Sequence, residues 1–305
     1  MDANVALGTG HETRGDGSIT RIPLSPHDVA ALPRLREKLA QFWSKTGEDP
    51  RTQFARFAEW TPIASGVTFD EDSQGTWSEP TNAVPREVIL HLHGGAYTKG
   101  SAHAFRGFAS QIAARTHRTV FSLNYPLAPE AHVPVAFDLV VSTLARLCAM
   151  YDSVSIVGDS AGGGLVAASL SEVAWPITAV VLFSPWLDLT LSGASMTDPS
   201  IHDPLLARDR LADSAHAYLG DAPPDDPRAS PLFAIPQQLP PLLIQVGTDE
   251  LLLDDSRRYA AAARRAGLRV QLEEWEAMHH VFQMSVAELE GARRALDRAA
   301  QFLTT

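Results

Sequence analysis

The chain has 305 residues, of which 45% are hydrophobic and 20% are charged, so it can bury a sizeable core and most of it is not disordered. Its formal net charge of −11 argues against a nucleic-acid partner, because phosphate binding needs a basic field. No apolar run reaches membrane-spanning length, and the first residues lack the apolar centre of a secretory signal. We therefore expect a cytoplasmic protein without a membrane span.

The N-terminal part is expected to form a loose tail and then two amphipathic helices. The first twenty or so residues are rich in Gly, Thr and Asp and show no periodicity. Apolar residues fall at helical spacing over residues 26–45, and a second helix over residues 50–60 carries Phe54, Phe57 and Trp60 on one side. We expect both helices to lie over the edge of a sheet, with these aromatic side chains either in the core or in contact with substrate.

Strand-like runs alternate with helix-like segments after residue 62, a pattern typical of a mostly parallel central sheet flanked by helices. The expected strands cover residues 66–69, 75–77, 87–92, 119–123, 154–157, 179–183, 242–246 and 270–274. A Pro- and Asp-rich stretch with one helix, about residues 209–218, interrupts the alternation. We expect an N-terminal tail with cap helices over residues 1–60 and a catalytic domain over residues 61–305, with a cap insertion at about residues 185–240.

The pentapeptide Gly158-Asp159-Ser160-Ala161-Gly162 lies between an expected strand and a helix of small residues. A serine on so sharp a turn has a strained backbone, and side chains two residues away on either side would collide. The two glycines therefore predict a nucleophile elbow from which Ser160 projects. Asp159 is expected to help hold this elbow.

Acyl transfer by a serine needs a base, a carboxylate that orients the base, and hydrogen-bond donors for the developing oxyanion. In the hydrolase architecture with such an elbow, the carboxylate and then the histidine follow the serine along the chain. Asp249 comes after the expected strand 242–246, and His280 comes after 270–274. The backbone N–H of Ala161 and those of the glycine turn after residue 92 are the expected donors, each contributing about 10²–10³-fold to turnover.

These motifs resemble the hormone-sensitive lipase family of α/β-hydrolases, in its bacterial esterase branch. The resemblance covers about three quarters of the chain and rests on His93-Gly94-Gly95-Ala96, Tyr125-Pro126-Leu127-Ala128-Pro129-Glu130, Gly158 to Gly163, Asp249 with Leu251 and Asp254, and His280-Val281-Phe282. It implies an α/β-hydrolase fold with a helical cap and a reaction without a cofactor.

The resemblance also implies a role for each matching residue. Ser160 is the nucleophile, His280 the general base and acid, and Asp249 the residue that orients the histidine. The oxyanion hole is formed by the N–H groups of Gly94, Gly95 and Ala161.

The chain departs from the family pattern at two positions. Ala96 stands where the family more often has a third glycine, but its backbone N–H is intact. Glu250 stands where relatives often have proline, which leaves two adjacent carboxylates. We favour Asp249 because its distance to Leu251 and Asp254 matches the family.

Several other residues have open roles. Tyr97, Trp186 and Phe282 either line the substrate pocket or pack in the core. Glu130 either supports the loop near the nucleophile or is a solvated carboxylate.

The remaining histidines and the one cysteine are expected to carry no chemistry. His279 is the neighbour of the catalytic histidine and has no assigned role. The spacing of His91 and His93 does not match a zinc site, so we expect no metal. Cys148 is expected on a buried helix face.

The sequence thus predicts a serine carboxylesterase that acts on short- to medium-chain esters through an acyl-enzyme. A lactone hydrolase with the same triad is the alternative, and a non-catalytic relative that binds small molecules is a third reading. A homodimer formed through the last strands is a further expectation from the family. The sequence does not specify the natural substrate or its enantiomer.

Overall fold

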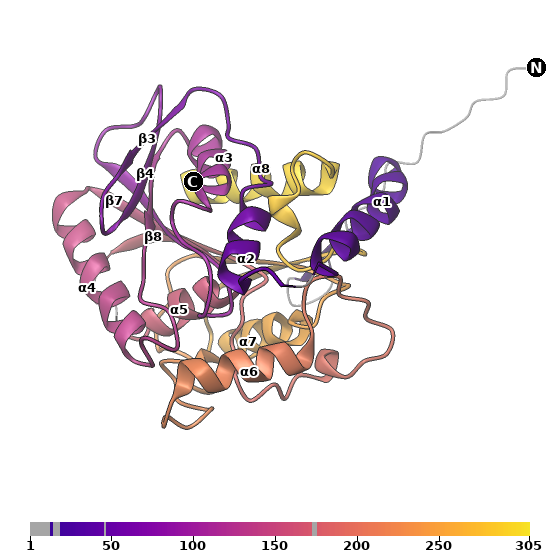
Figure 1. Ribbon diagram of the computed structural model, residues 1–305. Helices are drawn as coiled ribbons and strands as arrows, with labels where there is room; N and C mark the ends of the chain where they lie inside the picture. Colours follow the sequence, from indigo (N-terminus) through magenta and orange to yellow (C-terminus); the bar gives the residue numbers. More distant parts are fainter. Residues whose placement is uncertain (1–12, 15–18, 46, 173–175) are drawn as a thin grey trace, which may run out of the picture.

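The computed structural model describes residues 13–14, 19–45, 47–172 and 176–305, which form a ten-stranded sheet with helices on both faces (Figure 1). The strands are β1 (Thr13–Arg14), β2 (Ile19–Ile22), β3 (Val67–Glu71), β4 (Gly75–Pro80), β5 (Glu87–Leu92), β6 (Thr119–Leu123), β7 (Ser153–Asp159), β8 (Ile177–Phe183), β9 (Leu242–Gly247) and β10 (Val270–Trp275). The α-helices are α1 (Pro26–Trp43), α2 (Pro50–Ala58), α3 (Arg106–Thr116), α4 (Val135–Met150), α5 (Ser160–Ser169), α6 (Arg208–Leu219), α7 (Leu253–Arg265) and α8 (Glu290–Thr304).

The strand order across the sheet is β1-β2-β10-β9-β8-β7-β5-β6-β4-β3. Neighbours from β2 to β6 in this order are parallel, and β1, β4 and β3 pair antiparallel. The prediction of a mostly parallel sheet is confirmed. Because parallel strands end at the same edge, the loops after β5, β7, β9 and β10 meet there.

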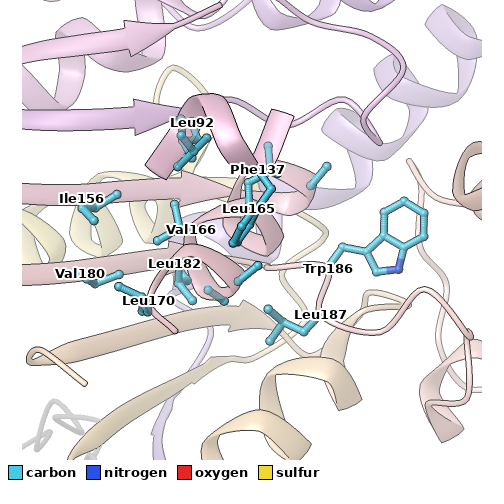
Figure 2. Packing of buried hydrophobic residues seen from close by; sticks show 14 of the residues in the cluster. Leu92, Phe137, Ile156, Leu165, Val166, Leu170, Val180, Leu182, Trp186 and Leu187 are labelled. Atoms are coloured by element: carbon cyan, nitrogen blue, oxygen red, sulfur yellow. The ribbon is translucent and has the colours of Figure 1, made fainter. Parts of the chain in front are cut away.

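Helices α4, α5 and α7 cover one face of the sheet, while α3 and α8 cover the other. Each layer buries its own apolar cluster, so the central strands are buried on both sides, which explains their apolar runs. Figure 2 shows Leu165 and Val166 of α5 packed beside Leu92, Ile156 and Leu182 of the strands. This packing fixes α5, and with it the start of the helix at Ser160.

Hydrogen bonds at the N-terminus of helix α1 attach it to helix α8. The Oγ of Ser25 caps it by accepting from the N–H of Asp28 at 3.1 Å. The buried Asp28 carboxylate in turn accepts from the N–H groups of Glu290 and Gly291, at 2.8 Å each, and so caps α8. One aspartate therefore joins the first helix to the last.

Helices α1, α2 and α6, which belong to the regions expected to form the cap, line one cavity beside the end of β7. The three helices expected in these regions are confirmed, with ends within two residues of the expected ones. None of the helices that the structure describes is long and apolar enough to cross a membrane.

Three expectations about the chain do not fit the structure. Part of the expected loose tail is wrong, because β1 and β2 are strands, although residues 1–12 and 15–18 lie outside the described part. Since β2 pairs with one side of β10 and β9 with the other, the last strand has no free edge for the expected dimer. Cys148 lies on α4 but is half-buried rather than in the core.

Candidate active site

Ser160 stands on the turn between β7 and α5 with a φ of 52°, in the left-handed region that side chains rarely adopt. A Cβ on Gly162 would overlap the carbonyl oxygen of Leu92, and a Cβ on Gly158 would lie 2.7 Å from the carbonyl oxygen of Gly162. The steric reason predicted for both glycines is therefore present in the structure. The turn holds the Ser160 side chain at the N-terminus of α5, facing a cavity under the cap.

A chain of polar contacts joins Ser160 to two other side chains. His280 Nε2 lies 2.9 Å from Ser160 Oγ, and His280 Nδ1 lies 3.1 Å from Oε1 of Glu250. The second oxygen of Glu250 accepts from the hydroxyl of Ser184 at 2.7 Å and from the N–H of Gly247 at 3.0 Å. Both partners of the imidazole are thus held in place, and the Glu250 side chain has no exposed surface.

The assignment of Asp249 as the residue that orients His280 is contradicted by this geometry. One carboxylate oxygen of Asp249 is paired with Arg36 of α1, and the other accepts from the backbone N–H of His202 at 2.6 Å. Neighbouring side chains after β9 leave the backbone in different directions, and the one that points inward belongs to Glu250. Its additional methylene lets the carboxylate reach the imidazole.

The electrostatic surroundings favour a protonated His280. Burial opposes the charged imidazolium, but the hydrogen bond that the imidazole donates to Glu250 and the negative charges of Glu250, Asp203 and Asp159 outweigh it, so the pKa of His280 is raised. Burial raises the pKa of Asp203 to about 6, although His280 and backbone N–H groups oppose the change. An imidazole with a raised pKa is a stronger base toward a serine hydroxyl.

Gly94 does not take the place predicted for it in the oxyanion hole. Its N–H donates to Oδ2 of Asp159 at 2.9 Å, and the other oxygen of Asp159 lies 3.3 Å from Nε2 of His91. Asp159 thus holds the upstream loop as well as the elbow. Among the described residues, neither Gly95 N–H nor Ala96 N–H has a protein acceptor, which leaves both available for an oxyanion. The sequence carried no sign of this shift by one residue.

The cavity beside Ser160 and His280 has an empty volume of about 790 Å³, including the part open to solvent. Its walls are mainly apolar, and its cap side is formed by Trp43, Phe54, Phe57, Leu205, Leu206 and Leu211. Of the two readings for the aromatic residues of α2, substrate contact is thus favoured for Phe54 and Phe57. The leucines and Trp43 were missed, because their position depends on how the cap folds over the sheet.

Tyr97, Trp186 and Phe282, the predicted pocket residues, pack in the core and are not among the residues that line this cavity. The Tyr97 ring stacks on Tyr218 with centroids 3.9 Å apart and also contacts Trp186. Figure 2 shows Trp186 on the chain after β8, apart from the labelled side chains of α5. Phe282 contacts Trp275 on the other side of the sheet.

Glu130 has a structural partner, whereas the buried Nδ1 of His279 has no hydrogen-bond partner among the described residues. Glu130 is exposed and forms a two-point ion pair with Arg51 of α2, whose hydrogen bonds lower the pKa of Glu130 to about 2. Burial, together with the charges of His280 and Arg36, lowers the pKa of His279 to about 3, so this ring is neutral.

The two histidines at the end of β5 also have contacts within the protein. His91 Nδ1 contacts Ser122, and His93 stacks on Tyr125 and contacts the carbonyl of Gly94. Within the described residues, no three His, Cys, Asp or Glu side chains are arranged to hold a metal ion.

Comparison with known proteins gives matches over the part of the chain that holds the site. A sequence family described as alpha/beta hydrolase fold matches residues 89–284, which include Ser160, Glu250 and His280. An esterase of Acinetobacter venetianus is 38% identical over 227 residues, which cover 72% of this chain and 75% of that protein. An acetyl-hydrolase of Streptomyces hygroscopicus is 37% identical over 236 residues, covering 75% and 79%.

Solved structures agree with these matches. A crystal structure of an esterase from the bacterial hormone-sensitive lipase family has a TM-score of 0.85 and 34% identity, and the match covers 92% of this chain and 98% of that one. The esterase EstE5, in crystals soaked with p-nitrophenyl butyrate, has a TM-score of 0.83 and 31% identity with the same coverage. The similarity therefore extends over the sheet and the cap.

Proposed function

The chain belongs to the hormone-sensitive lipase family of α/β-hydrolases and is a carboxylic ester hydrolase, and we propose that Ser160 is its nucleophile, His280 its general base and Glu250 the residue that orients the histidine. The observation that carries this assignment is the continuous set of contacts from Ser160 Oγ to His280 and on to Glu250. The alternative of a non-catalytic binding protein lacks support, because each of the three side chains has the partner that catalysis needs.

In the first half of the reaction, Ser160 Oγ attacks the ester carbonyl carbon while its proton passes to His280 Nε2. Glu250 stabilises the imidazolium that forms. The C–O bond to the alcohol then breaks, and the leaving alkoxide takes the proton from His280, which leaves an acyl group on Ser160.

In the second half, water attacks the acyl carbon and gives its proton to His280. The carboxylic acid departs when Ser160 Oγ takes that proton back, and the free enzyme is restored. No cofactor enters the cycle.

The negative oxygen of each tetrahedral intermediate is stabilised by the N–H groups of Gly95, Ala96 and Ala161. Gly95 and Ala96 qualify because their N–H groups have no acceptor in the part of the chain that the structure describes, and Ala161 because it follows the nucleophile at the positive end of α5. Asp159 acts as a positioning residue, since it holds the N–H of Gly94 and fixes the loop. Donors preorganised in this way contribute about 10²–10³-fold each.

The apolar walls of the cavity favour ester substrates whose acyl or alcohol group is apolar and of short to medium length. The division into cap and catalytic domain belongs to the same proposal, because α1, α2 and α6 supply the cap side of the cavity. The cytoplasmic location and the oligomeric state stay predictions. Lactone hydrolysis requires the same groups and differs only in the product, so it remains the alternative to be measured.

The test is hydrolysis of a p-nitrophenyl ester series from acetyl to dodecanoyl, together with a lactone, by the wild-type enzyme, Ser160→Ala and Ser142→Ala. Ser142 lies on the exposed side of α4 and serves as the matched control. We expect Ser160→Ala to lower kcat by about 10⁶-fold and the control to leave it unchanged. Full ester turnover by Ser160→Ala would contradict the mechanism, and turnover of the lactone alone would favour the alternative.

A further inference from the structure

Two basic side chains, Lys99 and Arg210, line the same cavity as Ser160 and His280. Lys99 follows the oxyanion loop, and its Nζ donates to the hydroxyl of Thr98 at 2.9 Å. Arg210 lies in the first turn of α6. Within the described part of the chain, neither side chain forms an ion pair with a carboxylate, although the protein as a whole has 36 acidic residues and 25 basic ones.

Lys99 is half-buried beside apolar walls, a costly place for a cation without an anion. Burial, followed by the charges of Arg210 and Arg51, lowers the pKa of Lys99. Arg51 is already paired with Glu130, so it does not need a further anion. Among the described residues that line the inner cavity, Lys99 and Arg210 are the lysine and the arginine, and neither is paired with a carboxylate.

Helix α6 adds to the positive potential. Its N-terminal residues Ala207, Arg210 and Leu211 line the cavity, and Ala207 offers no side chain to cap the free N–H groups. A natural protein usually places acidic residues at this end of a helix, where they offset the dipole. Here Asp209 is in the first turn but does not line the cavity, whereas the exposed Arg210 lies in the same turn, lines the cavity and acts on Lys99 through its charge. An anion bound in the cavity would offset both cations.

The acidic residues nearby do not neutralise the pair. Lys99 and Arg210 also line an outer hollow whose acidic walls are Glu48, Asp49, Glu130 and Asp213. Glu48 pairs with Arg56, Asp49 caps α2, and Glu130 pairs with Arg51. Asp213 faces that outer hollow and does not line the inner cavity.

We propose that the natural substrate carries a carboxylate a few bonds from the scissile ester and that Lys99 and Arg210 bind it. This inference rests on the esterase function proposed above and names its substrate class. Arginine binds a carboxylate through two parallel N–H donors, and lysine adds a point charge. Because Lys99 is three residues beyond Ala96, the carboxylate would lie near the ester carbonyl, and the apolar walls suit a short aliphatic or aromatic spacer between them.

The experiment measures kcat/KM on two matched substrate pairs that place the anion on either side of the ester. For the acyl side, monomethyl glutarate is compared with its neutral dimethyl ester. For the alcohol side, 4-acetoxybenzoate is compared with 4-acetoxybenzamide. The enzymes are wild type, Lys99→Gln, Arg210→Gln and the control Arg208→Gln, which removes the same charge from the same helix at a residue outside the cavity.

We expect wild type to prefer the anionic member of one pair by about tenfold or more, and the pair that shows the preference identifies the side that carries the anion. Lys99→Gln and Arg210→Gln should each reduce this ratio several-fold, Arg208→Gln should leave it in place, and added salt should weaken it. Since each ratio is internal to one variant, a general loss of activity does not change it.

Preference for the neutral member in both pairs would overturn the proposal, as would an equal loss of the ratio in Arg208→Gln. If the neutral esters are still turned over normally, either of these two results contradicts only the substrate class and not the esterase function. No turnover of any ester would instead remove the esterase function and the substrate class together.

Discussion

The imidazole of His280 and the carboxylate of Glu250 are 3.1 Å apart, and Glu250 reaches this position from the residue directly after Asp249. The two adjacent carboxylates face different partners. Asp249 joins Arg36 of α1 and the N–H of His202 in the cap, so it holds two cap segments against the end of β9. Glu250 faces the interior and contacts the imidazole of His280.

The raised pKa of His280 predicts a specific pH dependence of kcat/KM. General-base catalysis needs the neutral imidazole, so activity falls as pH decreases through this pKa, and a raised pKa moves that fall to higher pH. Asp203 contributes to the rise through its negative charge. Asp203→Asn should therefore shift the acidic limb of the profile to lower pH, by roughly half a pH unit, in line with about 1 kcal/mol or less for such a charge.

The profile of kcat/KM against pH, recorded for wild type and Asp203→Asn on p-nitrophenyl butyrate, checks this prediction. An acidic limb that stays in place or moves to higher pH would contradict it. A melting curve at each pH shows whether loss of folding contributes.

Exchanging glycine and alanine in the oxyanion loop should have opposite results at two neighbouring positions. Gly95 has a φ of 127°, and a Cβ there would overlap the carbonyl oxygen of Lys99, so Gly95→Ala should lower kcat by about 10²-fold. Ala96 has a φ of 53°, which glycine adopts more readily, so Ala96→Gly should keep kcat within about threefold. Steady-state kinetics with circular dichroism melts would check both, and equal effects of the two changes would argue against this loop as the oxyanion hole.

Phe57 of α2 is expected to limit the length of the group that the cavity accepts. Its ring lines the cavity, so Phe57→Ala should move the optimum of the p-nitrophenyl ester series toward longer chains, at a cost of about 1–3 kcal/mol in unfolding free energy. Tyr97→Phe is the control, since the Tyr97 side chain is buried outside the cavity and its hydroxyl has no hydrogen-bond partner among the described residues. A shift of the optimum in Tyr97→Phe, or none in Phe57→Ala, would show that the cavity is placed wrongly.

The strands, the order of the main motifs and the elbow at Ser160 could be predicted from the sequence because each depends on short-range patterns. A strand alternates or stays apolar over a few residues, and the elbow needs glycines within two positions of the serine. Even so, the sequence pattern predicts a tail where β2 lies, because four residues without a clear pattern become a strand only when they meet the edge of β10.

The parts of the site that were predicted wrongly depend on contacts between distant segments. The choice of Glu250 over Asp249 depends on where Arg36 and Ser184 lie, and the choice of Ala96 over Gly94 depends on the side chain of Asp159. The sequence did carry one sign, since a glutamate replaced the family's usual proline at position 250. The cavity walls depend on cap packing, which no local pattern describes.

The most direct test of the account compares Glu250→Gln with Asp249→Asn by kcat/KM on p-nitrophenyl butyrate. Glutamine keeps the size of the side chain but cannot stabilise the imidazolium, so Glu250→Gln should lose on the order of 10⁴-fold. Asp249→Asn weakens the pairing with Arg36 and should lose no more than about tenfold, comparable to a partly exposed ion pair. The reverse result, a large loss in Asp249→Asn and a small one in Glu250→Gln, would contradict the proposed triad of Ser160, His280 and Glu250.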